Sequence, residues 1–337
     1  MMDYTQLYST TEALHKRHAG KARDYAVPIN LVHLINPVNA PAGHDLARAQ
    51  AFTYESMRRA AAFAKEMDPS IRIDFVAAPL PEDVAAIPEG AIPLPELTRV
   101  SSEIGRFEVV RRLPLLMDII KRGREYVSSI EASPAPRLIF TNVDIGVLPH
   151  FYCYAAWLIR CGHDVAIINR RSVADCYGGP QDLPAILSDF GHKHPGLDCF
   201  IFDSGIVDHF VPFNSIIGMA HVMRPLFFNL MAFACNPVVL TDAHATFHIG
   251  FDSEWLSGKY ADYDRFNRGE CLKVIEALCA HDKSIEARLA AFVNSTDEHK
   301  WIPEGVLGVR KRRLVVPPLI TRIRLRLIRL LELKTHR

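Results

Sequence analysis

The stretch Arg137–Tyr152, with the sequence RLIFTNVDIGVLPHFY, decides how this chain is expected to fold. It opens with a short apolar run, Leu138–Phe140, preceded by prolines and followed by polar residues, and such a run is typical of a buried strand. Gly146 and Pro149 end any strand, and the apolar and aromatic segment after them is typical of a helix. Asp144 therefore lies where a parallel strand passes into its crossover helix, which is where open α/β sheets bind ligands.

Strands and helices alternate around this stretch. An apolar strand, Ile29–Ile35, precedes an Ala-rich helix, His44–Met67, and a second strand begins at Ile71. Later strands are expected from Asp164 and from Cys199. Strand–helix–strand order is the pattern of a parallel sheet. We therefore expect an α/β fold in which a mixed, mainly parallel, Rossmann-like sheet is flanked by helices.

Three further segments have a clear pattern. Five prolines between residues 79 and 98 predict a long loop without regular structure. The apolar segment Phe213–Phe233 predicts a buried helix, and a helix around Gly269–Asn294 is expected to close the domain.

The composition is that of a globular protein. Of the 337 residues, 49% are hydrophobic and 23% are charged, so the chain can bury a core. The seven cysteines include no CxxC pair, which argues against a disulfide framework or a cysteine zinc site and fits a reducing compartment. The N-terminus has no apolar signal region, and no apolar run is long enough to span a membrane. We expect a cytoplasmic protein.

The basic tail, residues 310–337, is set apart by its charge. It holds ten lysines and arginines and one glutamate, so its charge is +9 in a chain whose total is +1. Its apolar residues fall mostly on one side of a helical wheel, although the part IRLRLIR also alternates as a strand does. We expect it to bind anionic membrane headgroups, with packing on its own domain or on a partner subunit as the alternative. Nucleic acid is not expected, because the tail lacks aromatic residues for base stacking.

These observations divide the chain into three parts. Residues 1–28 form a polar segment with a weak helical pattern, residues 29–309 form the α/β domain, and residues 310–337 form the basic tail.

Asp144 is the first candidate for a ligand-binding residue. A carboxylate with an amide two residues before it, Asn142, suits a hard divalent cation, which takes oxygen ligands and often brings phosphate oxygens with it. An aspartate after a strand is also the usual residue of a turn or a helix cap. The spacing alone leaves both interpretations open.

Four segments, taken in order, resemble the nucleotide-sugar glycosyltransferases of the GT-A type. They are TNVDIGVLPHFY, INRRS, HPGLDCFIF and TFHIGFDSEW, and the resemblance covers about residues 29–260. More narrowly, they are similar to a little-characterised bacterial group that carries a TN-x-DI…P-x-FY segment and a TFHIG-D-x-W segment. The resemblance implies a GT-A-like fold and the transfer of a sugar from a nucleotide-diphosphate sugar to a glycan, such as a surface polysaccharide, or to a lipid-linked acceptor.

The resemblance also implies a metal site. Enzymes of this type hold Mn²⁺ or Mg²⁺ on the donor diphosphate with an Asp-x-Asp motif, and the matching residues here are Asn142, Val143 and Asp144. Asp144 is then a metal ligand, while Asn142 is a weaker neutral group that contacts ribose or a water on the metal. A late histidine often completes the metal shell, and His248 matches it. Carboxylate with imidazole favours Mn²⁺ over Mg²⁺. The alternative for His248 is a purely structural core histidine.

The segment HPGLDCFIF occupies the place where this family carries catalytic and acceptor-side groups. Asp198, just before a buried strand, is implied as the catalytic base or a sugar-binding residue, with Asp203 and Asp208 as competitors for that role. Gly196 is expected to let the backbone approach a ligand closely. His194 is expected to contact substrate, with a plain surface position as the alternative.

Five more residues complete the expected site. Arg170 and Arg171 follow a strand and suit a phosphate clamp, because guanidinium groups bind phosphate bidentately. A solvent-exposed strand end is the equal alternative for this pair. Asn36, at the end of the first strand, is implied as a nucleotide contact. Asp252 and Trp255 are expected to shape the acceptor pocket, although Trp255 is also a normal core residue.

The sequence thus predicts a glycosyltransferase that uses a nucleotide sugar and a divalent cation. Asn142 favours an alternative, a catalytically silent protein that binds a nucleotide or glycan and serves as an assembly partner. A metal-dependent hydrolase would need more carboxylates near Asp144 than the chain offers. No GxGxxG, Walker, HExxH or GxSxG motif is present, so dinucleotide oxidoreductases, P-loop NTPases, zinc proteases and α/β-hydrolases lose their usual support.

Overall fold

The structure is a computed structural model that describes the chain over the ranges 7–19, 27–194, 196–250, 258–294, 302–303 and 305–308. The basic tail lies outside the described residues, as do Asp252 and Trp255 of the expected acceptor pocket.

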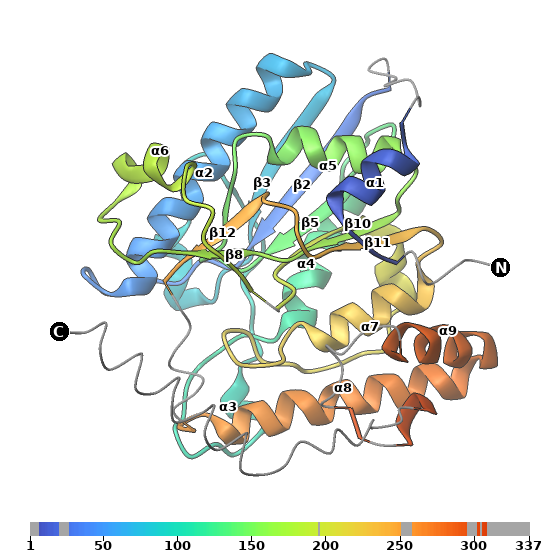
Figure 1. Cartoon of the computed structure of the whole chain (residues 1–337). Helices are drawn as coiled ribbons and strands as arrows, with labels where there is room; N and C mark the ends of the chain where they lie inside the picture. Colours follow the sequence, from blue (N-terminus) through green and yellow to red (C-terminus); the bar gives the residue numbers. More distant parts are fainter. Residues whose placement is uncertain are drawn as a thin grey trace, which may run out of the picture.

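An eight-stranded sheet forms the centre of the molecule (Figure 1). The strand order is β1-β11-β7-β10-β5-β2-β3-β4. Its strands are β1 (Tyr8–Ser9), β2 (Ile29–Ile35), β3 (Ile71–Ala77), β4 (Ile92–Pro93), β5 (Arg137–Thr141), β7 (Val165–Ile168), β10 (Cys199–Asp203) and β11 (Pro237–Leu240). Neighbouring strands are parallel except at β10, which is antiparallel to both β5 and β7. The expectation of a mixed, mainly parallel sheet is confirmed.

A smaller four-stranded sheet, with the order β6-β12-β8-β9, adjoins the first. Its strands are β6 (Gly146–Val147), β8 (Arg171–Val173), β9 (His192–Lys193) and β12 (Thr246–Ile249). In the chain, β6 follows β5 and β8 follows β7, so two strands of the main sheet lead directly into the small one. β12 pairs with both β6 and β8, and so it joins the segment that follows β5 to the segment that follows β7.

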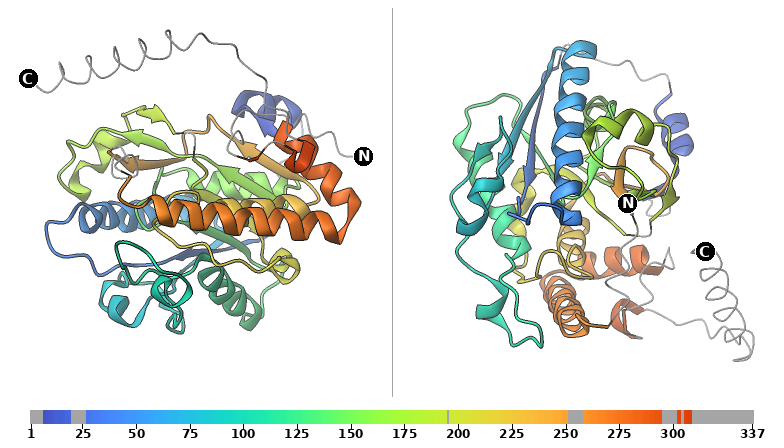
Figure 2. Two further views of the ribbon diagram at one scale, coloured as in Figure 1. Left: turned by 90° about the horizontal axis from the view of Figure 1, so that it is seen from below. Right: turned by 90° about the vertical axis from the view of Figure 1, so that its left-hand side faces the viewer.

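Helices cover both faces of the main sheet (Figures 1 and 2). They are α1 (Thr11–Arg17), α2 (Asp45–Met67), α3 (Ser101–Ile104), α4 (Leu116–Ser129), α5 (Phe151–Arg160), α6 (Leu183–Ile186), α7 (Arg224–Phe233), α8 (Ala261–His281) and α9 (Lys283–Asn294). The long helices α2 and α8 lie on different sides of the sheet in Figure 2.

The two faces bury separate apolar cores, because successive strand side chains point to opposite faces. Leu31 and Ile35 of β2 pack with residues of α1, α2 and α5. Val32 and Leu34 of the same strand pack with residues of α4, α7, α8 and α9. All seven residues of β2 are buried, as expected for a central parallel strand.

The apolar segment Phe213–Phe233 is helical only from Arg224, where α7 begins. Pro225 occupies the first turn of α7, a position that suits proline because its missing N–H has no helical partner there. Gly218 and His221 have φ angles of 69° and 61°, which a right-handed helix cannot include. The apolar pattern therefore reflects burial of the preceding loop as well as of the helix.

The closing helix is two helices, α8 and α9, that meet at Asp282. The backbone of Asp282 is extended, with φ −152° and ψ 128°. Its Oδ1 accepts a hydrogen bond of 2.7 Å from the amide of Ser284, in the manner of an N-terminal cap.

The proline-rich stretch is less irregular than expected. It contains a 3-10 helix, Pro81–Ala86, which starts on a proline, and the edge strand β4. Both positions tolerate proline because neither requires its missing N–H.

The described part of the N-terminal segment extends the main sheet. β1 pairs with β11, with Tyr8 opposite Val239. The backbone amide and the hydroxyl of Thr11 both donate to Asp242 Oδ1, at 2.9 and 3.0 Å.

Within the described ranges, no helix has both the length and the apolar character needed to cross a membrane. All seven cysteines lie in the described ranges, and each is a free thiol there.

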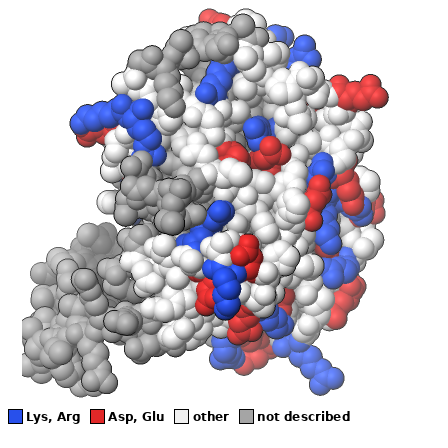
Figure 3. Space-filling model, turned by 90° about the vertical axis from the view of Figure 1, so that its right-hand side faces the viewer, with Lys and Arg blue, Asp and Glu red and all other residues white. Residues whose placement is uncertain are grey.

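Charged side chains of both signs are interspersed on the face shown in Figure 3. Exposed pairs of this kind each contribute little stability, because water and salt screen them. The part of this face that the structure describes therefore carries no block of one sign comparable to the basic tail.

Candidate functional site

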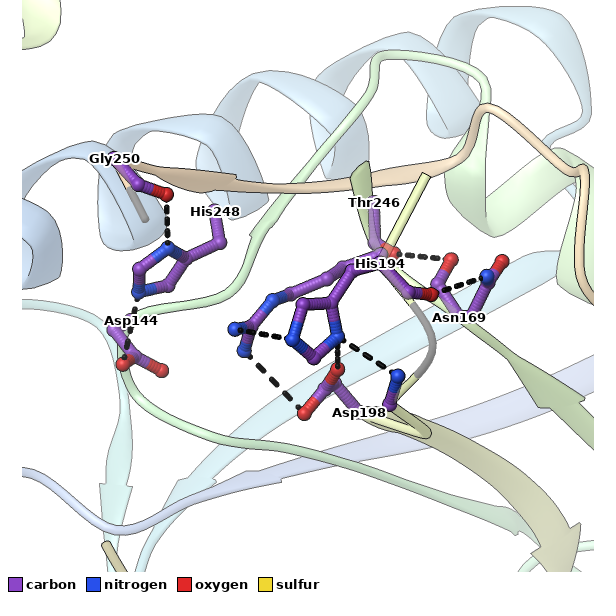
Figure 4. Close-up of polar contacts among 9 residues, drawn as sticks. Asp144, Asn169, His194, Asp198, Thr246, His248 and Gly250 are labelled. Carbon is purple, nitrogen blue, oxygen red and sulfur yellow. Dashed lines mark hydrogen bonds and ion pairs between the residues drawn. The ribbon is translucent and has the colours of Figure 1, made fainter. Parts of the chain in front are cut away.

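Polar groups from separate segments meet at one edge of the main sheet (Figure 4). β10 runs antiparallel to β5, with Cys199 opposite Thr141. The residue before β10, Asp198, therefore lies at the edge where the chain leaves β5 toward Asp144. β12 pairs with β6 just beyond this edge and carries His248.

Asp144 and His248 face each other. His248 Nε2 lies 3.4 Å from Asp144 Oδ2, and His248 Nδ1 lies 3.1 Å from the carbonyl oxygen of Gly250 (Figure 4). A carbonyl oxygen only accepts, so Nδ1 carries a proton and a neutral ring directs its Nε2 lone pair at Asp144. A lone pair and a carboxylate repel each other. The pair is therefore satisfied either by a second proton on His248 or by a cation that both side chains bind.

The environment keeps Asp144 ionised. Burial alone would raise the pKa of Asp144, but the hydrogen bond and charge of His248 and the charge of Arg170 outweigh it, so the pKa lies below its ordinary value. An ionised carboxylate is the form that binds a metal ion.

Two oxygens beside this pair have no hydrogen-bond partner. Asp144 Oδ1 and Asn142 Oδ1 are both buried, and neither accepts a hydrogen bond within the described structure. Buried polar atoms without partners are uncommon, because they lose their hydration without compensation. Two unpartnered oxygens next to an imidazole nitrogen fit a divalent cation, and the set of N and O ligands suits Mn²⁺.

The protein alone does not complete a metal shell in the described residues. They contain no group of three or more His, Cys, Asp or Glu side chains placed to hold a metal ion. Asp144 and His248 make two, and Asn142 is an amide. A cation held here would take its other ligands from substrate oxygens and water, which is common where a metal binds together with a phosphate.

A second polar cluster lies beside the first. Arg170 follows β7 and is buried, and its Nη1 lies 3.4 Å from Asp198 Oδ1. Asp198 Oδ2 lies 3.6 Å from His194 Nδ1 and has no hydrogen-bond partner in the described structure. Because the charge of Arg170 also lowers the pKa of Asp144, one guanidinium acts on both carboxylates.

Gly196 positions the ring of His194. The Gly196 amide donates a 2.8 Å hydrogen bond to His194 Nδ1. A Cβ on residue 196 would lie 2.5 Å from His194 Cε1, so only glycine lets the ring fold back over the backbone. In this structure the ring of His194 occupies the space beside Gly196, and the expected approach of the Gly196 backbone to a ligand remains a prediction.

Two residues outside the set predicted from the sequence support this loop. Asn169 Nδ2 donates to the carbonyl oxygen of His194 at 2.7 Å, and Thr246 Oγ1 donates to the carbonyl oxygen of Asn169 at 3.3 Å (Figure 4). Both are buried. Asn169 was recognisable as a polar residue between an apolar strand and Arg170, whereas Thr246 only becomes relevant through the pairing of β12.

Asn36 and Arg171 bind backbone carbonyls. Asn36 is buried at the C-terminal side of β2 and donates to the carbonyl oxygen of Ala78 at 2.7 Å, which fastens β2 to the residue after β3. Arg171 donates to the carbonyl oxygens of Phe190 and Gly191, the latter at 3.1 Å. In this structure these side chains hold loops, and their expected contacts with nucleotide and phosphate remain predictions.

Asp203 lies at the other end of β10 from Asp198. Its Oδ2 is 2.5 Å from Arg137 Nη1, and its Oδ1 accepts from the amide of Gly205 at 2.9 Å. The register of β10 places it opposite Arg137, at the start of β5, whereas Asp144 follows the end of β5. The structure thus brings Asp198 to the site and leaves Asp203 at the opposite edge of the sheet.

Comparisons with known proteins concern the fold only. No family model matches the chain, and no curated protein matches its sequence. Solved structures that resemble it include S. aureus TarS 1–349 in complex with UDP-GlcNAc, at 12% identity and a TM-score of 0.42, over 79% of this chain and 72% of that one. Another is described as a nucleotide-diphospho-sugar transferase from Desulfovibrio desulfuricans G20, at 11% identity and a TM-score of 0.34, over 76% and 98%.

A third similar structure is the 4-diphosphocytidyl-2C-methyl-D-erythritol synthase of Anaerococcus prevotii, at 7% identity and a TM-score of 0.33, over 72% of this chain and 99% of that one. The agreement with the fold class expected from the sequence rests on this chain's own mixed sheet and flanking helices. With TM-scores below 0.5, these likenesses carry no argument about substrate or activity, and a function has to be inferred from the residues of this chain.

Proposed function

We propose that this protein is a glycosyltransferase that moves a sugar from a nucleotide-diphosphate sugar to a hydroxyl of a glycan or lipid-linked acceptor, assisted by a divalent cation. One observation carries the proposal. The side chains of Asp144 and His248 face each other at 3.4 Å beside two buried, unpartnered oxygens, at the edge where the strands of an α/β sheet end. Such an edge is the usual ligand site of this architecture.

Asp144 and His248 would hold the cation, with Asn142 as a neutral neighbour. Mn²⁺ fits this donor set better than Mg²⁺, because imidazole is a poorer ligand for the harder ion. When bound, the cation stabilises the negative charge that develops on the departing diphosphate. The lowered pKa of Asp144 keeps its carboxylate ready to bind at neutral pH.

Arg170 would bind the donor diphosphate. It is buried next to the proposed metal ligands, and its charge already acts on Asp144. A guanidinium forms two parallel hydrogen bonds to phosphate oxygens and is always charged, so it suits a site where negative charge increases during reaction.

Asp198 would act as the base. Its Oδ2 accepts the proton of the acceptor hydroxyl while that oxygen bonds to the anomeric carbon and the bond from this carbon to the diphosphate breaks. Oδ2 is suited to this because it has no hydrogen-bond partner in the described structure. His194 and Gly196 would then form the acceptor-side wall, and Asp252 and Trp255 remain proposed acceptor contacts from the sequence.

A silent binding protein is the second candidate function. Asn142 in place of an aspartate removes one charged oxygen from the metal site, which weakens cation binding. The same site would then bind nucleotide sugar without transfer. Turnover separates the two candidates, since both predict binding.

The test is thermal unfolding of the full chain with a panel of nucleotide sugars, each with and without Mn²⁺. The matching donor together with Mn²⁺ should raise the stability by about 2.7 kcal/mol at a hundredfold excess over its dissociation constant. Asp144→Asn should abolish this metal-linked gain and the transfer of sugar while the protein stays folded. Asp203→Asn is the matched control, because Asp203 lies at the other end of the sheet. Near-normal turnover by Asp144→Asn would exclude the proposed metal site.

The basic tail supports a separate proposal, a membrane partner. Its +9 charge and apolar residues would place the enzyme at an anionic membrane surface, next to a lipid-linked acceptor. Each cation close to such a surface contributes about 1 kcal/mol, so several suffice for reversible binding. Sedimentation with anionic liposomes should pull down the full chain at low salt and leave behind a chain that ends at Val309. Equal sedimentation of both would exclude this role.

A further inference from the structure

A groove lined by aromatic side chains runs along the outer surface of α5, between α1 and the last turns of α2. It encloses a cavity of about 230 Å³. We call it the aromatic groove, and its main lining residues are His15, Phe63, Met67, His150, Tyr154 and Trp157. None of these side chains has a role in the proposed transfer reaction.

One wall is a stack of aromatic rings. Tyr154 and Trp157 lie one turn apart on α5, with ring centroids 5.5 Å apart and an angle of 16° between the planes. His15 of α1 lies against Trp157 at a centroid distance of 4.6 Å. Tyr154 and Trp157 are only partly buried, because α5 directs Phe151, Tyr152 and its alanines toward the sheet instead, and His15 is exposed.

The facing wall is apolar and exposed. Phe63 and Met67 lie one turn apart on α2, with 37% and 61% of their surface exposed. Single exposed apolar residues are ordinary, but two of them opposite a ring stack form a continuous apolar slot. A slot between an aromatic wall and an apolar wall suits a flat ligand.

The groove carries no net charge from its paired ionic groups. Arg160 and Asp68, at one end, bind each other at 2.6 Å and are nearly buried. Burial lowers the pKa of His150, and burial with the nearby Asp68 raises the pKa of Cys153, so both of these groups are uncharged at neutral pH. The groove therefore favours an uncharged ligand over a phosphate, a nucleic acid or an acidic peptide.

We infer that the aromatic groove binds a neutral oligosaccharide. Sugar rings present flat faces of C–H groups with partial positive charge, which pack on the negative π faces of Trp and Tyr. Their hydroxyls need hydrogen-bonding groups, and the imidazoles of His15 and His150 are among the lining side chains. A purely alkyl ligand would gain nothing from these polar groups. The length of α5, ten residues or about 15 Å, accommodates a chain of several sugar units.

This site is separate from the one at Asp144 and His248. It requires neither a cation nor a nucleotide, so it stands if the proposed transfer reaction fails. If that reaction is correct, the aromatic groove would retain the acceptor glycan away from the reacting hydroxyl and so raise its local concentration.

The experiment is calorimetric titration of the full chain with maltotetraose, cellotetraose and chitotetraose, in the absence of nucleotide and metal. At least one should bind. Trp157→Ala should weaken that binding about tenfold, and Trp157→Phe by less, because a smaller ring remains. Phe63→Ala tests the opposite wall with little risk to the fold. Phe190→Ala is the matched control, since Phe190 is an aromatic residue that is 75% exposed outside the groove.

Three outcomes would overturn the inference. The first is that none of the three oligosaccharides binds at millimolar concentration. The second is that binding is the same in the wild type, Trp157→Ala and Phe63→Ala. The third is that dodecyl maltoside below its micelle concentration binds while the oligosaccharides do not, which would assign the groove to an alkyl chain. Unchanged binding by Asp144→Asn is expected and separates this site from the proposed metal site.

Discussion

Strand β10 has an aspartate near each end, and each aspartate meets an arginine. Asp198 lies 3.4 Å from Arg170, and their side chains are 10% and 5% exposed. Asp203 lies 2.5 Å from Arg137, and their side chains are 45% and 25% exposed. The two aspartates are five positions apart in the chain. One forms a loose, buried pair with arginine at one edge of the sheet, and the other forms a close, partly exposed pair at the opposite edge.

The difference shows how position in a sheet decides what an ion pair does. At the Asp203 edge, water screens the charges and the pair mainly holds the start of β5 to the end of β10. At the Asp198 edge the charges are desolvated, one carboxylate oxygen has no hydrogen-bond partner, and a second carboxylate lies within the field of the same arginine. The low dielectric there strengthens electrostatic interactions, and binding and catalytic sites use such an environment.

The difference between the two edges is tested most directly by neutralising each aspartate in turn. Asp198→Asn should lower the turnover of the proposed transferase by about 10²–10⁴-fold, the usual contribution of a general base. Asp203→Asn should leave turnover nearly unchanged. The measurement is the steady-state rate with the donor identified by thermal unfolding. Equal losses in both variants would exclude the assignment of Asp198 as the base.

The arginines allow a test of stability. Arg170→Met should lower the free energy of unfolding by about 3–5 kcal/mol, because it leaves a buried carboxylate without its partner. Arg137→Met should cost about 1 kcal/mol or less, because Asp203 regains hydration. Urea unfolding of both variants checks this. If Arg170→Met is as stable as Arg137→Met, the burial of the Asp198 pair is not what distinguishes the two edges.

A buried histidine with only neutral hydrogen-bond partners extends the comparison to a group without an ion pair. His33 is fully buried on β2, between the hydroxyls of Tyr152 at 2.7 Å and Thr141 at 2.9 Å. Burial lowers the pKa of His33 from 6.5 to about 3. Below pH 6.5 the unfolded chain takes up a proton that the folded chain refuses, so the free energy of unfolding decreases as the pH falls toward 3.

This pH effect of His33 should be smaller than the effects of Asp198→Asn and Arg170→Met. Between pH 7 and pH 5 the wild type should lose about 2 kcal/mol more stability than His33→Gln, which has no proton to take up. Urea unfolding of both proteins across this pH range gives the difference. Parallel loss in both proteins would mean that His33 is protonated in the folded state.

One half of the candidate site was easier to locate from the sequence than the other. Asp144 follows a short apolar strand, and this local signal was sufficient to place it at the carboxyl end of a parallel strand. His248 lay in a recognisable segment, but only the pairing of β12 with β6 brings it to Asp144. Asp198 and Asp203 flank the same apolar run, so their order along the chain could not tell which one faces the site.

That choice depends on the direction of β10. In a parallel strand, the residue after the strand would reach the ligand edge and Asp203 would have been favoured. Because β10 is antiparallel, the residue before it reaches that edge. Direction is set by how distant strands pair, which a single sequence does not display. The contacts of Asn36 and Arg171 with backbone carbonyls were hidden for the same reason, since their partners come from other segments.

The small sheet has a consequence for local unfolding. Its strand β6 consists of two residues, 146 and 147, and is held to β12 across about a hundred positions of the chain. So short a pairing opens at a lower free energy than the main sheet does. A ligand that bridges Asp144 and His248 would close this opening and slow amide hydrogen exchange in 146–147 and 246–249, while β2 and β5 would exchange as before. The candidate site is therefore coupled to one of the least extensive strand pairings in the described fold. Binding of a ligand there would be measured as slower hydrogen exchange of those few amides.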